Sequence, residues 1–120
     1  MAVSALIASL LLAQASGPAV VDVAFNELAS GNAAAAISKI EKDQAREGDH
    51  PARLINLGVA YAREGRTADA RAMFETVARS DTRYRLETAD GGWMDSRDLA
   101  RRALAMLDNG ELTSARLASR

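Results

Sequence analysis

The stretch Leu57–Phe74, "LGVAYAREGRTADARAMF", carries the strongest structural signal in the sequence. Its apolar residues recur at helical spacing on both sides of Glu64–Gly65–Arg66, which predicts two helices joined by a short turn. Gly58 stands inside the first of these helices, where a glycine costs about 1 kcal/mol relative to alanine. Close contact with the second helix at Ala70 would offset this cost, because packing contacts strengthen as two helices approach. The glycine therefore predicts a tight antiparallel hairpin.

The same pattern occurs 34 residues earlier in the chain. When Gly31–Gln44 is aligned with Gly65–Ala78, glycine, alanine and glutamate positions coincide. Extending the alignment backward pairs Ala24 with Gly58, so a small residue is expected in the middle of each first helix. A third unit is indicated by Gly110, which follows an apolar stripe at helical spacing in residues 95–108. The sequence therefore contains an internal repeat.

This repeat resembles the tetratricopeptide repeat, a 34-residue helix–turn–helix unit. The central repeat, Pro51–Tyr84, carries the family signature at Leu54, Leu57, Gly58, Tyr61, Ala70 and Phe74. The preceding repeat, Gly17–His50, departs from the pattern with Glu27 in the tyrosine position. The usual closing proline of the central repeat is replaced by Thr82. The resemblance implies an all-α, right-handed superhelix of antiparallel helix hairpins, about two and a half repeats long.

Helix-start signals agree with these boundaries. Pro51, directly after His50, suits the first turn of a helix, where its missing N–H is harmless. Asn32 and Thr67 are expected to be the N-caps of the two second helices. Asp95, with Asp98 three residues later, resembles a capping box at the start of the third unit.

Residues 82–94 form an insertion that a plain repeat does not need. Tyr84, Leu86 and Thr88 alternate with charged residues, which is strand-like spacing, and Ala89–Gly92 is a turn signal. We expect an extended segment and a turn here. We expect Trp93 to cover the exposed end of the superhelix; the alternative is that Trp93 contacts a ligand.

The first 15 residues differ from the rest of the chain. Ala5–Ala13 is almost entirely apolar and uncharged, and Ala13–Gln14–Ala15 has the form of a signal-peptidase site. We predict a signal peptide at 1–15 and a helical repeat domain at 16–120. The apolar run is too short to cross a bilayer, so no membrane span is expected in the mature chain. The expected location is the periplasm or the exterior; if residues 1–15 are instead an apolar first helix, it is the cytoplasm.

Composition limits the chemistry available to the protein. The 120 residues include 15 basic and 16 acidic residues, a balance that does not favour nucleic acid as a partner. Cysteine is absent and His50 is the only histidine, so neither a metal site nor a cofactor is expected. No glycine-flanked nucleophile turn or phosphate-binding glycine loop occurs. We therefore expect the protein not to be an enzyme.

A binding groove is the function that the resemblance implies. In the family, the first helices line a concave face on which a peptide lies. The matching candidates in this sequence are Ile55, Asn56, Val59, Arg63, Arg97 and Arg101. Asn56, Arg97 and Arg101 also resemble residues with which some family members hold a terminal carboxylate, a group that arginine binds through two parallel hydrogen bonds.

These candidates predict a non-catalytic module of the cell envelope that binds a protein or peptide partner or a second copy of itself. Two alternatives stay open: a binder of a small anionic ligand on the arginine-lined face, and a hydrolase or transferase with a carboxylate in the groove.

Overall fold

Most of the chain that the structure describes is helical. The computed structural model describes residues 24–112. The helices are α2 (Phe25–Ala29), α3 (Ala33–Glu47), α4 (Pro51–Arg63), α5 (Thr67–Arg79) and α6 (Ser96–Asp108). Strands β1 (Arg85–Glu87) and β2 (Trp93–Asp95) form a small antiparallel sheet between α5 and α6. The fold is thus mainly α-helical with a small sheet. The predicted signal peptide and the second helix of the third unit lie outside the described residues.

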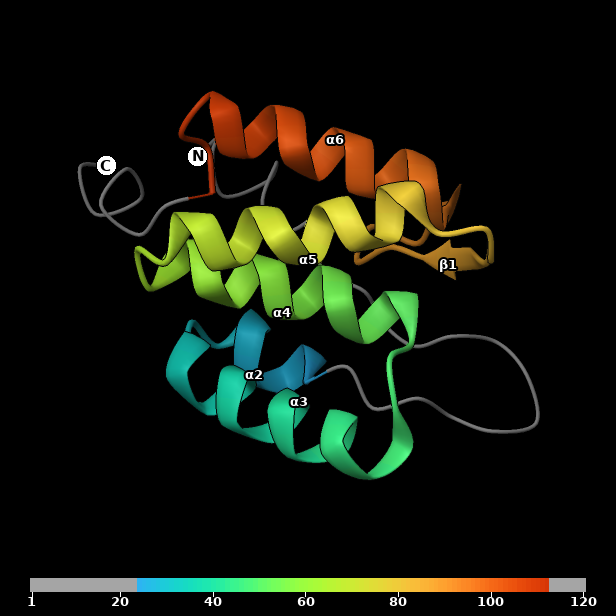
Figure 1. The fold of residues 1–120 in the computed structure, drawn as a ribbon. Coiled ribbons are helices and arrows are strands. Elements are labelled where there is room, and N and C mark those ends of the chain that lie inside the picture. The colour runs from blue at the N-terminus through green and yellow to red at the C-terminus, as the bar shows by residue number, and fades with distance from the viewer. Residues whose placement is uncertain (1–23, 113–120) are drawn as a thin grey trace.

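The helices stack in chain order. Each of α3, α4, α5 and α6 packs against the helix before it, and α4 also contacts α2 and α6. Figure 1 shows this stack, with α2 and α3 at one side, α6 at the other, and the hairpin beside the end of α5. Helix α4 is therefore the centre of the molecule, and every residue from Pro51 to Ala62 is buried.

Three turns share one hydrogen-bond pattern. After α4, the Gly65 N–H donates to the Ala62 carbonyl and the Arg66 N–H donates to the Tyr61 carbonyl. The same pair of bonds forms around Gly31 after α2 and around Gly110 after α6. The three glycines have φ values of 81°, 80° and 73°, in the left-handed region that glycine adopts without steric cost. Helices α2, α4 and α6 thus end with the same glycine-dependent motif, which satisfies their last carbonyls.

The close approach predicted at Gly58 is confirmed, although the contacting residue differs. A Cβ atom placed on Gly58 would lie 2.4 Å from Cε1 of Phe74, well inside van der Waals contact. The predicted contact was with Ala70. The ring of Phe74, fully buried on α5, fills the space over the glycine instead. Helices α4 and α5 pack closely because the Phe74 ring of α5 lies directly against the backbone of α4 at Gly58.

The predicted helix starts are correct in part. The Asn32 side chain accepts a hydrogen bond from the Ala35 N–H, and the Asp95 carboxylate accepts from two backbone N–H groups of α6, so both are N-caps as predicted. Thr67 is not: α5 begins at Thr67, and Arg66 occupies the cap position without a side-chain bond. Ala24 is not in the middle of a helix either, because α2 begins only at Phe25 and Ala24 has a φ of 56°.

The insertion folds as a β-hairpin attached to α6. Leu86 pairs with Met94 on the inner face, and Glu87 pairs with Trp93 on the outer face. The side chain of Leu86 is 1% exposed, whereas that of Trp93 is 45% exposed. The prediction that Trp93 covers the end of the helices is therefore wrong, since the inner residues Leu86 and Met94 pack on the core instead.

Candidate functional site

The groove residues predicted on α4 lie inside the protein. Ile55, Asn56 and Val59 have no exposed surface. Arg63, at the end of the same helix, is half-buried and donates a 2.7 Å hydrogen bond to the Leu28 carbonyl, which ties α4 to α2. Burial lowers the pKa of Arg63 from its usual value. A partner-binding role for these four residues stays a prediction, and for the first three it requires that α4 become uncovered.

The two arginines predicted on the third helix have different surroundings. Arg101 is exposed and forms a 2.9 Å ion pair with Asp98, one turn earlier on α6. Arg97 is partly buried, and its Nε atom has no hydrogen-bond partner among residues 24–112. The six candidate residues therefore do not form one open surface. The arginine pair alone lies near the outside of α6.

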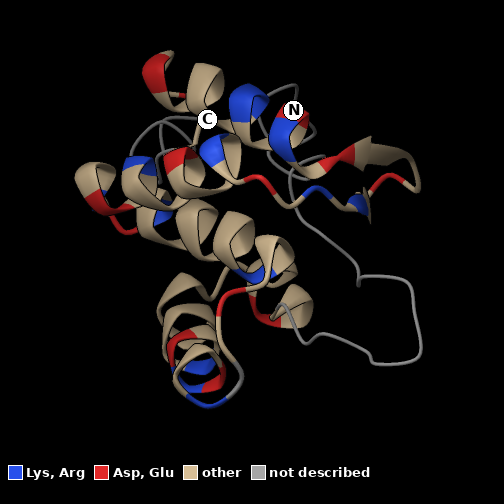
Figure 2. Cartoon of the chain, turned by 45° about the vertical axis from the view of Figure 1, so that its right-hand side comes forward, with Lys and Arg blue, Asp and Glu red and all other residues tan. Residues whose placement is uncertain are grey.

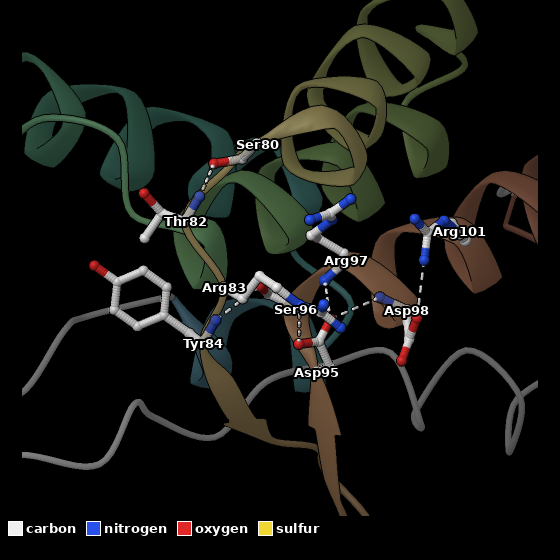
Figure 3. A network of polar contacts seen from close by, with 9 residues as sticks. All are labelled: Ser80, Thr82, Arg83, Tyr84, Asp95, Ser96, Arg97, Asp98 and Arg101. Carbon is white, nitrogen blue, oxygen red and sulfur yellow. Dashed lines mark hydrogen bonds and ion pairs between the residues drawn. The ribbon is translucent and has the colours of Figure 1, made fainter.

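A polar network fixes the segment that leads into the hairpin (Figure 3). The Arg83 guanidinium pairs with the Asp95 carboxylate at 2.8 Å, and the Tyr84 backbone exchanges hydrogen bonds with the Ser96 backbone and hydroxyl. The hydrogen bond from Arg83 is the largest cause that lowers the pKa of Asp95 below its usual value. The segment before β1 is thus held against the first turn of α6.

A pocket opens where this segment passes the ends of α4 and α5. Its volume is about 270 Å³. The floor is apolar and buried, and consists of Pro51, Leu54 and Val77. The rim is polar and consists of Asp49, Thr76, Ser80, Thr82 and Tyr84. An apolar floor with a few polar groups at the edge is the usual composition of a ligand site.

Several rim groups are already engaged within the protein. The Thr76 hydroxyl donates to the Ala72 carbonyl, and the Ser80 hydroxyl oxygen accepts from the Thr82 N–H. Figure 3 shows the Thr82 and Tyr84 side chains extending from the same segment, with the Tyr84 hydroxyl pointing away from the network. The Tyr84 ring lies 4.6 Å from that of His50, and this contact fixes one wall of the pocket.

His50 has a structural role beside this pocket. Its Nδ1 atom accepts a hydrogen bond from the Ala52 N–H and caps α4. Burial, and secondly the charge of Arg53, lower the pKa of His50 below its usual value. An unprotonated Nδ1 is needed for the cap, so the lowered pKa and the hydrogen bond agree. Within residues 24–112, no group of three His, Asp or Glu side chains is placed to hold a metal ion.

Charges of both signs are distributed over the same elements. Figure 2 shows Lys and Arg interspersed with Asp and Glu on the helices and the hairpin. Surface ion pairs account for much of this pattern, including Arg71 with Asp108 and Arg66 with Asp69.

The comparisons with known proteins give no relative. No protein-family model matches the chain, and no curated protein or solved structure matches it either. Across the described helices, none combines the length and the apolar character needed to cross a membrane.

The pocket was not predicted from the sequence. Its residues come from three short segments, 49–54, 76–80 and 82–84, which only the packing of α5 on α4 brings together. The alternating pattern at Tyr84 was the one available signal, and it indicated a strand without showing that the ring borders a cavity.

Proposed function

We propose that the protein is a non-catalytic interaction module, built of tetratricopeptide-like helical hairpins, that binds a protein or peptide partner. The repeat is supported by the three identical glycine turns, two of them 34 residues apart. It is also supported by the packing of α4 on both α2 and α6, since neighbouring first helices contact each other in a stack of hairpins. We therefore propose that the hairpins form a right-handed superhelix of about two and a half repeats.

The observation that carries the binding function is the surface of the insertion. In the part of the chain from Ala24 to Leu112, the large hydrophobic side chains that stay exposed are Tyr84 at 39% and Trp93 at 45%. Both belong to the segment that a plain repeat does not need. Tyrosine and tryptophan are the residues that most often anchor protein interfaces. We therefore place the partner on the hairpin and the adjoining pocket, rather than on the concave face of α4.

The carboxylates near this surface are suited to structure rather than to proton transfer. Hydrogen bonds from Thr88 and the Gly92 N–H lower the pKa of Asp90, and Arg83 lowers that of Asp95. Such groups stay ionised at neutral pH, whereas a catalytic acid needs a raised pKa. This favours binding over catalysis.

The experiment is capture of a partner with matched variants. The wild-type chain and Tyr84→Ser/Trp93→Ser are immobilised and exposed to cell-envelope extract, with Glu75→Ala as a control on the exposed side of α5. We expect a polypeptide that is retained by the wild type and the control and lost with the double variant. Equal retention by all three proteins, or no retained polypeptide, would contradict the proposal. Light scattering of the purified chain identifies a second copy as the partner.

A second candidate function rests on Arg97. The guanidinium of Arg97 is partly buried, and its Nε atom has no hydrogen-bond partner among the described residues. A small anionic ligand could accept a hydrogen bond from it. Titration with phosphate and with acetate, monitored by amide NMR shifts around the first turn of α6, tests this candidate. Shifts that saturate and disappear in Arg97→Gln would support it; shifts that do not saturate would oppose it.

We also propose that the chain is exported and loses residues 1–15. The support is the uncharged apolar run and the small residues at Ala13 and Ala15. Amino-terminal sequencing of protein recovered from its host should begin at Ser16. A product that retains Met1 or Ala2 would contradict export and indicate the cytoplasm.

A further inference from the structure

We propose that the pocket between α4, α5 and the hairpin receives a basic side chain, lysine or arginine, of the partner polypeptide. This inference rests on the proposed function and names the chemistry of the bound group. It depends on three properties of the pocket: its size, its apolar floor and the single carboxylate on its rim.

The size favours one side chain over a whole cofactor. Pockets that enclose drug-sized molecules hold roughly 300–1,000 Å³, and this one holds about 270 Å³. A single lysine or arginine side chain is smaller than that space, and the rest of the partner can then lie along the exposed face of the hairpin.

The floor suits an alkyl chain. Leu54 and Val77 present buried methyl groups from facing helices, and Pro51 adds its ring at the start of α4. Lysine and arginine bury their methylene groups against such surfaces and keep the charged end at the rim.

The rim supplies the opposite charge. Asp49 is the one ionisable carboxylate among the lining residues, and no Lys or Arg lines the pocket. One oxygen of Asp49 accepts a hydrogen bond from the Gln44 amide. Among the interactions of the described chain, Asp49 has no ion pair. Arg53, four residues later, donates to the Gly48 carbonyl, and Arg46, Arg79 and Arg83 pair with Asp43, Glu75 and Asp95.

The aromatic wall adds a second attraction for a cation. The Tyr84 ring borders the pocket and is held in place by His50. A cation near an aromatic face gains electrostatic energy from the ring. Asp81, whose two chain neighbours both line the pocket, adds a further exposed negative charge to the same segment.

The test uses small probes that differ only in the charged group. The full chain, labelled with ¹⁵N, is titrated with N-acetyl-lysine methylamide and, separately, with N-acetyl-norleucine methylamide, which keeps the alkyl chain and lacks the ammonium. We expect saturable shifts of the amides of Asp49, Val77 and Tyr84 with the lysine probe, and at least tenfold weaker binding of the norleucine probe, since a hydrogen bond to a charged group contributes about that factor.

Two variants connect the binding to this pocket. Asp49→Asn should weaken binding of the lysine probe about tenfold. Asp69→Asn is the control: Asp69 pairs with Arg66 at the end of α5 away from the pocket, and its substitution should leave the affinity unchanged. Thr76→Trp fills the pocket from an exposed position and should abolish binding while circular dichroism stays native.

The outcomes separate this inference from the proposed function. Equal binding of the two probes, or unchanged affinity of the lysine probe for Asp49→Asn, overturns the inference. If a partner is captured through Tyr84 and Trp93 and its retention is unchanged in Asp49→Asn, the inference fails and the proposed function stands. If the lysine probe binds and no polypeptide is captured, the pocket's selectivity for a basic side chain stands and the proposed binding of a polypeptide fails.

Discussion

At the scale of single residues, Gly58 shows how one missing side chain determines the geometry of a hairpin. The ring of Phe74 occupies the space where a Cβ atom would lie, and the ring cannot move far because it is fully buried. Glycine at this position lowers the helix propensity of α4, but it allows an aromatic ring to pack directly on the helix backbone.

We predict that Gly58→Ala destabilises the protein, although alanine is the better helix former. The helix preference favours alanine by about 1 kcal/mol, whereas overpacking a buried site costs about 1–3 kcal/mol. Urea unfolding gives the change. The control is the same substitution in a Phe74→Leu background, where removal of the ring should lessen the penalty. A stabilised Gly58→Ala single variant would show that the ring adapts freely.

Tyr61 provides a second prediction at this scale. Its hydroxyl donates to the Glu41 carboxylate across α3 and α4, and burial, together with that bond, raises its pKa to about 12 from 10. The folded protein therefore keeps a proton that the unfolded chain loses between these values. Its contribution to stability is complete below pH 10 and is lost as the pH rises toward 12.

We expect the unfolding free energy of the wild type to fall more steeply between pH 10 and 12 than that of Tyr61→Phe. Urea unfolding at several pH values measures both slopes, and the tyrosine absorbance near 295 nm follows the ionisation itself. Identical slopes would mean that Tyr61 ionises in the folded protein as it does in the unfolded chain.

At the scale of elements, the β-hairpin is the part that distinguishes this chain from a simple helical stack. It is short, yet its inner face is built into the core through Leu86 and its base is tied to α6 through Asp95 and Ser96. A three-residue strand pair is marginal by itself, so these attachments hold it in shape.

We predict that Leu86→Ala lowers the unfolding free energy of the whole protein by about 2–5 kcal/mol, the usual range for a fully buried leucine. Arg85→Ala, one residue earlier and exposed, should change it by less than about 1 kcal/mol. Thermal unfolding followed by circular dichroism compares the two. If Leu86→Ala unfolds only the hairpin and leaves helix melting unchanged, the insertion is an independent unit.

Much of the secondary structure could be predicted from the sequence, because helix boundaries depend on local signals. Pro51, Asn32 and Asp95 mark helix starts through backbone chemistry that needs no tertiary contact. The side on which Trp93 lies could not be predicted in this way. In a strand, a shift of one residue exchanges the two faces, and the register is set by contacts of Leu86 and Met94 with the helices.

At the scale of the whole molecule, helix α4 connects the parts. It touches the helices on both sides, and α6 in turn holds the hairpin. A stack this short has few interfaces that could separate, so we predict one cooperative unfolding transition.

Two probes test that prediction. Fluorescence of Trp93, the single tryptophan, reports on the hairpin, and circular dichroism at 222 nm reports on the helices. The two urea curves should share a midpoint and a slope. A fluorescence midpoint at lower urea would mean that the hairpin separates before the helices unfold.

The candidate site shows what the sequence could not predict at this scale. The pattern at Ile55, Asn56 and Val59 indicated a groove because first helices of such repeats have an open side, but in this fold α4 is buried all round. The pocket at Asp49 arises from segments far apart in the chain, and no local spacing connects them. Contacts between elements, rather than propensities within them, decide which residues are accessible.

The complete burial of α4 has a consequence for how this protein tolerates change. In a surface helix, harmful substitutions recur with the helical period, and a saturation library shows alternating permissive and intolerant codons. From Pro51 to Ala62, where all twelve positions are buried, no such alternation should occur. Arg53 is already charged and donates a hydrogen bond to the Gly48 carbonyl, and the other positions should reject charged replacements almost alike. On α5 and α6 the exposed faces should accept them in periodic fashion. An aligned set of variants selected for folding alone would thus contain one continuous conserved block, within which Pro51 and Leu54 also line the pocket.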